Sequence, residues 1–217
     1  MTDNVLEFHN IFKTFGVSKT RIDSLKNINL IIESKSLNLI LGSSGTGKST
    51  LLNIASLIDT PTNGEVLIKN INTNKLSDSE KSRIRRDEIG VIYQRDNLFP
   101  YLNILENVMV PLVGDDKLKA VKLLKIVGLE DVSKFPNEIS IMDQQRVAFS
   151  RALINNPSLL LADEPTGELN SEDAEELLNL IRDVGGKCGV LIASNNSDLS
   201  EYCDNTFYLK DGTLTRK

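Results

Sequence analysis

The sequence has few of the residues that build metal centres or disulfide frameworks. Among 217 residues it contains two cysteines, Cys188 and Cys203, and one histidine, His9. The cysteines do not have the spacing of a metal-binding pair, so we expect reduced structural thiols, which suits a reducing cytoplasm. We interpret His9 as a surface residue.

Long apolar runs and an excess of positive charge are also missing. No window approaches the ~18 uninterrupted apolar residues of a membrane-spanning helix, and the amino terminus lacks a basic-then-apolar secretory pattern. The net charge is -5 and the pI about 5.1, which argues against an extended nucleic-acid surface. Four basic residues on a predicted helix over 76–87 are interpreted as a solvated face: Lys81, Arg83, Arg85 and Arg86. Any membrane role must therefore come through a partner.

What the chain does contain is a glycine-rich segment between an apolar run and a helical pattern. The segment Gly42-Ser43-Ser44-Gly45-Thr46-Gly47-Lys48-Ser49-Thr50 fits the phosphate-binding pattern G-x-x-x-x-G-K-[ST]. Residues 37–41 before it read as a buried strand, and residues 48–57 after it as a helix. The pattern alone can arise by chance, but strand, turn and helix together are the context that a phosphate-binding loop needs.

The residue types in this loop explain its chemistry. Glycines let backbone N–H groups surround phosphates without a Cβ in the way. The following helix directs the positive end of its dipole at the same anion. Lys48 is expected to lie between the β- and γ-phosphates, and the Ser49 hydroxyl to ligate Mg²⁺. We therefore predict a nucleotide-binding site.

A second motif follows 115 residues after Lys48, where an apolar strand ends in two carboxylates, Asp163 and Glu164. In a P-loop fold a neighbouring strand delivers its terminal Asp to the Mg²⁺ shell, and Asp163 fits that role. Glu164 is placed to polarise the attacking water as a general base. A strand that merely ends in an acidic turn is the simpler interpretation, and the upstream loop argues against it.

Patterns at both ends of the chain alternate strands and helices around a mostly helical middle, residues 97–153. Strands are predicted at 5–8, 27–33, 65–69, 89–93, 158–163 and 190–194, with a hairpin over 206–216 that turns at Asp211-Gly212. Helices are predicted at 117–127, ending before Gly128, at 143–154, and at 171–184 with Asn170 as N-cap. This order indicates an α/β fold, a parallel-sheet core with an inserted helical lobe.

Several segments together resemble the nucleotide-binding subunits of ABC transporters over nearly the whole chain. The group closest to it drives lipoprotein release, macrolide export and the cell-division complex. The resemblance implies a P-loop NTPase of ABC type with an amino-terminal antiparallel β subdomain. It also implies a single domain, residues 1–217, with a core lobe of 1–94 and 155–217 and a helical lobe of 95–154. The matching segments are residues 85–94, 103–108, 144–148, 162–167 and 209–212.

The resemblance further assigns roles at matching positions. Phe15 corresponds to the aromatic residue that stacks on adenine, and Gln94 to the glutamine of the Mg²⁺ and water shell. Ser140 would reach the γ-phosphate of ATP bound by a second subunit, because two subunits enclose two ATP molecules. The implied partners are that second nucleotide-binding subunit and an integral membrane permease, which would dock around residues 97–106. The implied location is the cytoplasmic face of the membrane, and the implied direction is export.

Two departures from the family bear on mechanism. The signature segment reads Ile139-Ser140-Ile141-Met142-Asp143, without the family's glycines. One alternative is that the two side chains prevent the close approach of this segment to phosphate when the dimer closes. The other is that Ile141 and Met142 turn into the core and the helix still caps phosphate. Asn195 stands where the family has a histidine, and losing one transition-state donor costs about 10²–10³ in rate. A third change, Asn170 at the position of an aspartate, is milder.

These departures lead to the hypothesis of an ATPase subunit with low intrinsic turnover, raised by a distinct partner subunit. The alternative is an ATP-gated regulatory or structural subunit with little turnover. Retained Glu164 favours the enzyme, whereas Asn195 and the altered signature favour the regulatory role. A DNA-repair or chromosome-organising ATPase is disfavoured, because the chain has no heptad run and no CxxC pair.

Overall fold

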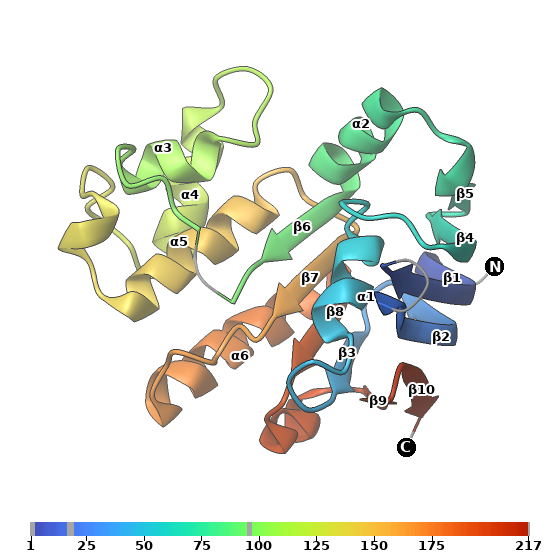
Figure 1. Ribbon diagram of the computed structural model, residues 1–217. Helices are drawn as coiled ribbons and strands as arrows, with labels where there is room; N and C mark the ends of the chain where they lie inside the picture. Colours follow the sequence, from blue (N-terminus) through green and yellow to red (C-terminus); the bar gives the residue numbers. More distant parts are fainter. Residues whose placement is uncertain (1–2, 17–19, 95–96, 217) are drawn as a thin grey trace.

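A computed structural model describes residues 3–16, 20–94 and 97–216 (Figure 1). Its amino-terminal part forms a small sheet of four described strands, all antiparallel, in the order β2-β1-β4-β5. This arrangement agrees with the antiparallel subdomain that the family resemblance implied. The strands are β1 (Asn4–Phe15), β2 (Ile22–Glu33), β4 (Asn63–Ile68) and β5 (Ile71–Asn72).

The larger sheet has six described strands in the order β10-β9-β3-β8-β7-β6. Neighbours run parallel except at the hairpin of β9 and β10, which turns through Asp211 and Gly212 at φ 50° and 78°. Its central strands β3 and β8 are buried at every residue, as strands covered on both faces must be. The strands are β3 (Leu37–Leu41), β6 (Ile89–Ile92), β7 (Leu159–Asp163), β8 (Gly189–Ser194), β9 (Asn205–Lys210) and β10 (Thr213–Arg216).

Alternate residues of the large sheet face two different cores. Leu160 and Ala162 of β7 face a cluster that contains buried residues of helices α3 to α6. Leu159 and Leu161 face a cluster with α1 and the small sheet. The helices are α1 (Lys48–Ala55), α2 (Asp78–Glu88), α3 (Ile104–Met109), α4 (Lys117–Ile126), α5 (Ile141–Leu153) and α6 (Ser171–Gly185). Short 3-10 helices are η2 (Thr73–Lys75), η3 (Pro136–Glu138) and η4 (Ser197–Tyr202).

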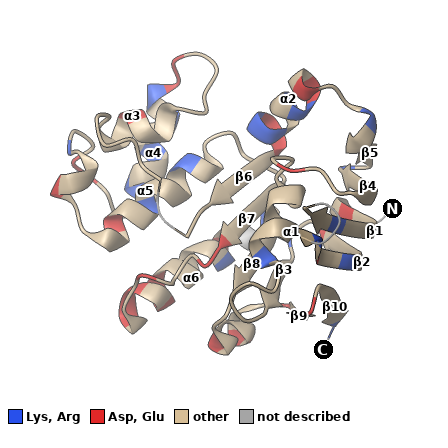
Figure 2. Ribbon diagram, in the orientation of Figure 1, with Lys and Arg blue, Asp and Glu red and all other residues tan. Residues whose placement is uncertain are grey.

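Helices α3, α4 and α5 gather beyond β6, on the side away from the small sheet (Figure 1). The caps predicted for this part and for α6 are formed. Gly128 follows α4 at φ 83°, and Asn170 accepts a 3.0 Å hydrogen bond from the backbone nitrogen of Asp173. This arrangement fits the helical insertion, while its limits at residues 95 and 154 stay a prediction. Lys and Arg positions are spread over several elements in Figure 2.

Several predicted boundaries are wrong. Strand β1 continues to Phe15 instead of ending at Phe8, and β2 begins at Ile22 instead of Asn27. The two strands stay paired through several register shifts, which a search for strict alternation misses. Helix α5 begins at Ile141 rather than Asp143, because the Ser140 hydroxyl accepts the Asp143 backbone N–H at 3.1 Å and caps the helix.

Candidate active site

The carboxyl ends of strands β3, β7 and β8 meet at one cavity. Their parallel registers pair Leu41 with Ser194 and Asp163 with Ala193, so the residues that follow each strand are brought together. The cavity has a volume of about 360 Å³. It is lined by Ser24, Ser44, Gly45, Gly47, Lys48, Ser49, Thr50, Gln94, Asp163, Glu164, Gly167 and Asn195.

The glycine-rich loop closes tightly over neighbouring backbone. A Cβ on Gly42 would lie 2.6 Å from the carbonyl oxygen of Leu209, and one on Gly47 would lie 2.8 Å from that of Ser24. Gly47 also has φ 105°, which side-chain-bearing residues rarely adopt. Gly42, Ser43 and Thr46 are not among the described residues that line the cavity. The Thr46 hydroxyl donates to the Ser43 carbonyl at 2.9 Å. The loop is therefore a backbone cradle that fits phosphate oxygens.

Lys48, the first residue of α1, is buried in this cradle with 6% of its surface exposed. Its ammonium group donates to the carbonyl oxygens of Gly42 at 2.7 Å and Ser43 at 3.2 Å. It also lies 3.3 Å from Oε1 of Glu164. A buried ammonium group needs such partners, and phosphate oxygens can replace them.

Asp163 and Ser49 both line the cavity and contact each other. Burial raises the pKa of Asp163 above its ordinary value of 3.8, while a hydrogen bond with Ser49 opposes that shift. Over the described residues no cluster of three or more His, Cys, Asp and Glu side chains is arranged for a metal. One carboxylate, one hydroxyl and the Gln94 amide are an oxygen donor set that suits Mg²⁺ when phosphate oxygens complete the shell.

Glu164 has an unusual backbone and a well-defined carboxylate. Its φ is 45°, in the left-handed region, and its backbone N–H donates to the Ala193 carbonyl at 2.8 Å. Its Oε2 accepts hydrogen bonds from the Ser194 hydroxyl at 2.8 Å and from the Asn195 backbone N–H at 3.1 Å. Sequence reasoning missed Ser194; its place at the end of an apolar strand, just before Asn195, was the available signal.

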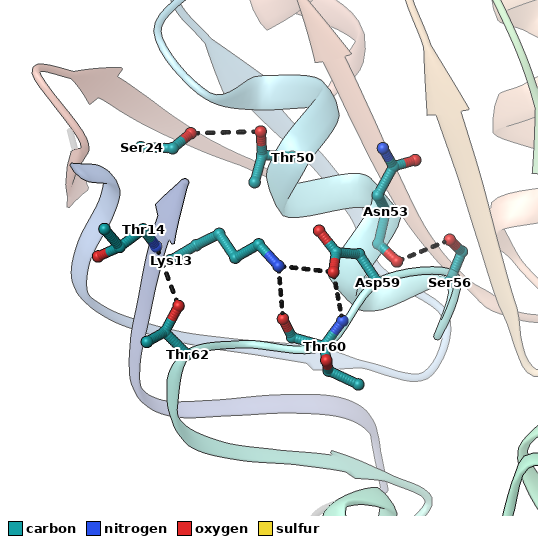
Figure 3. Close-up of polar contacts among 9 residues, drawn as sticks. All are labelled: Lys13, Thr14, Ser24, Thr50, Asn53, Ser56, Asp59, Thr60 and Thr62. Carbon is teal, nitrogen blue, oxygen red and sulfur yellow. Dashed lines mark hydrogen bonds and ion pairs between the residues drawn. The ribbon is translucent and has the colours of Figure 1, made fainter. Parts of the chain in front are cut away.

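Phe15 ends β1, is 44% exposed, and is not among the described residues that line the cavity. Its strand is fixed beside the end of α1, as Figure 3 shows. The Lys13 ammonium donates to Asp59 Oδ1 at 2.6 Å and to the Thr60 carbonyl at 2.8 Å, and the Thr62 hydroxyl accepts the Thr14 N–H at 3.0 Å. The same ammonium lies 4.9 Å from the centre of the Phe15 ring. The contact of the Phe15 ring with adenine stays a prediction.

The two residues that replace the glycines of the signature segment, Ile141 and Met142, differ in burial. Met142 turns into the helical core with 5% of its surface exposed, whereas Ile141 remains 53% exposed at the start of α5. Ser140 is exposed and does not line its own chain's cavity, as the across-dimer role requires. Of the two alternatives, the one in which both side chains turn into the core therefore holds for Met142 and fails for Ile141.

The two cysteines and His9 are not among the described residues that line the cavity. Both cysteines are free, and burial raises the pKa of Cys188 to about 11 and that of Cys203 to about 12. His9 Nε2 lies 3.0 Å from Glu7 Oε2 on a partly exposed part of β1. No helix in the described ranges combines the length and apolarity needed to cross a bilayer.

The family model described as ABC transporter matches residues 25–167, from within β2 to just beyond the acidic pair. The chain belongs to the ABC transporter family. It is 41% identical to the uncharacterized ABC transporter ATP-binding protein MJ0796 of Methanocaldococcus jannaschii, over 98% of this chain and 96% of that protein. It is 39% identical to the lipoprotein-releasing system ATP-binding protein LolD of Wigglesworthia glossinidia brevipalpis, over 98% and 97% respectively.

The ABC transporter fold is confirmed by solved structures. The dimeric post-hydrolysis state of the MJ0796 cassette, bound to ADP and Pi, matches with a TM-score of 0.88 and 38% identity, over 97% of this chain and 98% of that one. A second dimeric structure of MJ0796 matches with a TM-score of 0.87 and 39% identity, over the same shares. The chain is therefore an ATP-binding subunit of this transporter family and an ATPase.

Proposed function

We propose that ATP hydrolysis at this cavity drives a membrane permease, with each catalytic role assigned to a residue described above. The observation that carries this proposal is that Lys48 and Ser49, at the start of α1, line the same cavity as Asp163 and Glu164, at the end of β7. Lys48 and the backbone of residues 42–50 bind the phosphates. Glu164 polarises the attacking water, and Gln94 and Asn195 offer amide groups at the cavity wall.

Mg²⁺ is the ion that suits the donor set. Ser49, Asp163 and Gln94 would hold it, and bound Mg²⁺ would neutralise negative charge on the phosphate oxygens. Phe15 supplies a flat apolar surface for adenine, which its exposed ring allows.

A second nucleotide-binding subunit completes the site in this proposal. Ser140 lies outside its own chain's cavity, and its hydroxyl proton remains available for donation, because its oxygen serves as the acceptor at the helix cap. Two copies arranged head to tail would bring Ser140 of each copy to the ATP of the other, and the MJ0796 cassettes, which this chain resembles, are dimeric. A different ATPase subunit with an intact signature is the alternative partner, and would leave one altered feature in each site.

The permease would dock on the cytoplasmic subunit beside residues 97–106. Phe99 and Tyr101 are 49% and 91% exposed there, and exposed aromatic side chains are typical contact residues of protein interfaces. A cavity of about 300 Å³ nearby is lined by Ile58, Arg85, Arg86, Tyr93 and Arg151, among others. The test is copurification with the permease. Tyr101→Glu is expected to abolish it, and Ile126→Glu, at another exposed apolar residue, is expected to retain it.

Intrinsic hydrolysis is proposed to be slow. The exposed Ile141 side chain stands where the family has glycine, and Asn195 replaces a histidine. Steady-state phosphate release by the purified chain is expected well below ~1 s⁻¹, the low end of ordinary enzyme turnover. Asn195→His is expected to raise it by about tenfold or more, since one transition-state donor is worth about 10²–10³. A wild-type rate at or above ~1 s⁻¹ removes this part of the proposal.

An ATP-gated regulatory subunit is the second candidate. The observation that favours it is the pairing of an altered signature with Asn195, both of which weaken hydrolysis more than binding. Tight ATP binding without turnover, even with the permease present, would support it. Turnover that rises when the permease is added supports the transport ATPase, and efflux measured in vesicles would establish export.

A further inference from the structure

The Glu164 carboxylate is held at both oxygens by different parts of the chain. Oε1 faces the ammonium group of Lys48 at 3.3 Å. Oε2 accepts the Ser194 hydroxyl at 2.8 Å and the Asn195 backbone N–H at 3.1 Å. The two oxygens therefore have separate partners, the Lys48 ammonium group on Oε1 and the end of β8 on Oε2.

The Ser194 hydroxyl is a directed donor. Its oxygen accepts the backbone N–H of Asn196 at 3.1 Å, which leaves the hydroxyl proton for Glu164. Ser194 has 1% of its surface exposed, and its carbonyl accepts the N–H of Gly42 at 3.2 Å. Because the Ser194 side chain is buried and its hydroxyl has a partner as donor and as acceptor, it keeps one rotamer. Ser194 thus contacts Gly42, the first residue of the glycine-rich loop, through its carbonyl and Glu164 through its hydroxyl.

The two partners differ in what happens when phosphates occupy the cradle. Lys48 then has phosphate oxygens as partners and releases Oε1. Ser194 lies at the strand end and keeps Oε2. The contact that residue 195 makes with Glu164 comes from its backbone, which every non-proline residue supplies. In the described part of the chain, Ser194 is thus the neutral side chain that fixes the carboxylate.

We propose that Ser194 is a positioning residue for hydrolysis, whose hydroxyl holds Oε2 of Glu164 so that Oε1 faces the attacking water. This inference rests on the proposed role of Glu164 as general base. It assigns the orientation of the Glu164 carboxylate to the Ser194 side chain, whereas Asn195 contacts this carboxylate through its backbone. The contacts described for the Ser194 hydroxyl go to Glu164 and to the Asn196 backbone, and neither residue belongs to the loop over 42–50. Its removal should therefore change turnover and spare binding.

The experiment compares Ser194→Ala, Ser194→Thr and Thr73→Val in the full chain. Thr73 is a matched control, because it is 3% exposed and donates its hydroxyl to the Val66 carbonyl at 3.0 Å, in the small sheet. Single-turnover hydrolysis and ATP affinity are measured for each. Ser194→Ala is expected to lower the hydrolysis rate by about 10- to 100-fold, the range for a hydrogen bond to a charged group, with ATP affinity within about twofold. Ser194→Thr should recover most of the rate, and Thr73→Val should retain it.

The same measurements on Glu164→Gln test the general-base role of Glu164 separately from the positioning role of Ser194. If Glu164→Gln hydrolyses ATP at the wild-type rate, the general-base role itself fails. If Glu164→Gln is slow while Ser194→Ala has the wild-type rate, the role of Ser194 alone is overturned. The double variant decides between action through Glu164 and independent action. A rate close to that of Glu164→Gln supports positioning, and a further loss by the full Ser194→Ala factor contradicts it.

Discussion

The ammonium group of Lys48 contacts Oε1 of Glu164 at 3.3 Å while it donates to the Gly42 carbonyl at 2.7 Å. The residue expected to bind phosphate and the residue expected to activate water are therefore partners of each other within the described chain. Phosphate binding has to compete with this ion pair. Nucleotide affinity and hydrolysis are thus linked through one contact.

The first prediction concerns that contact. Glu164→Gln removes the negative charge that competes for Lys48, so ATP affinity should rise several-fold while hydrolysis falls by about 10²–10⁴, the range for a general base. Lys48→Ala should lose measurable ATP binding. Isothermal titration with ATP and Mg²⁺ gives the affinities. Unchanged affinity in Glu164→Gln would show that the ion pair does not oppose binding.

The second prediction separates the two altered signature residues. Ile141 is exposed, so Ile141→Gly should cost about 1 kcal/mol or less of stability and should raise hydrolysis at saturating ATP by removing a side chain from the closing surface. Met142 is buried, so Met142→Ala should destabilise the fold by about 2–4 kcal/mol. Urea unfolding and phosphate release measure both. Equal losses of stability in the two variants would contradict the burial described for them.

The third prediction concerns the thiols. Burial raises the pKa of Cys203 to about 12 from an ordinary 9.0, so its thiolate fraction at pH 8 is about 10³-fold lower than in the unfolded chain. Both thiols hold their protons more tightly in the folded state, so their contribution lowers stability as pH rises above about 9. Alkylation by iodoacetamide at pH 8 should be slow in the native chain and fast in urea. Rapid native labelling of either cysteine would disprove this.

The fourth prediction concerns the loop that presents Phe99 and Tyr101. Asn107 is fully buried; its Oδ1 accepts the Phe99 N–H at 2.7 Å, and its amide donates to the carbonyls of Phe99, Leu102 and Asn103 at 3.1, 2.9 and 3.1 Å. Asn107→Ala removes the partners described for the Phe99 N–H and the Leu102 carbonyl, while the Phe99 and Asn103 carbonyls keep backbone donors. The loss should destabilise the fold by about 2–4 kcal/mol. The exposed Asn179→Ala on α6 should change stability by less than about 0.5 kcal/mol. Thermal unfolding compares them, and similar melting temperatures would count against this role.

Some of these features could be predicted from the sequence because they are local. The glycine-rich loop needs a strand before it and a helix after it, and all three lie within residues 37–57. The acidic pair at residues 163 and 164 is equally local. The hairpin turn at Asp211-Gly212 and the Asn170 cap follow from backbone preferences of single residues.

Other features depend on contacts that no local pattern contains. Ser194 and Glu164 are 30 residues apart in the sequence and are in contact because β8 lies beside β7 in the sheet. The order of strands in a sheet cannot be predicted from either segment alone. The extension of β1 to Phe15 depends on irregular pairing with β2. Ile141 is exposed and Met142 is buried because Ser140 is the N-cap of α5. A helix that began one residue earlier or later would direct a different side chain into the core.

A crystal structure of the Glu164→Gln variant with ATP and Mg²⁺ tests the central claim most directly. We expect triphosphate within the backbone of residues 42–50, the Lys48 ammonium moved from the Gly42 carbonyl to the phosphates, and a metal between Ser49 and Asp163. Nucleotide bound elsewhere, or Lys48 still on the Gly42 carbonyl beside bound ATP, would contradict it.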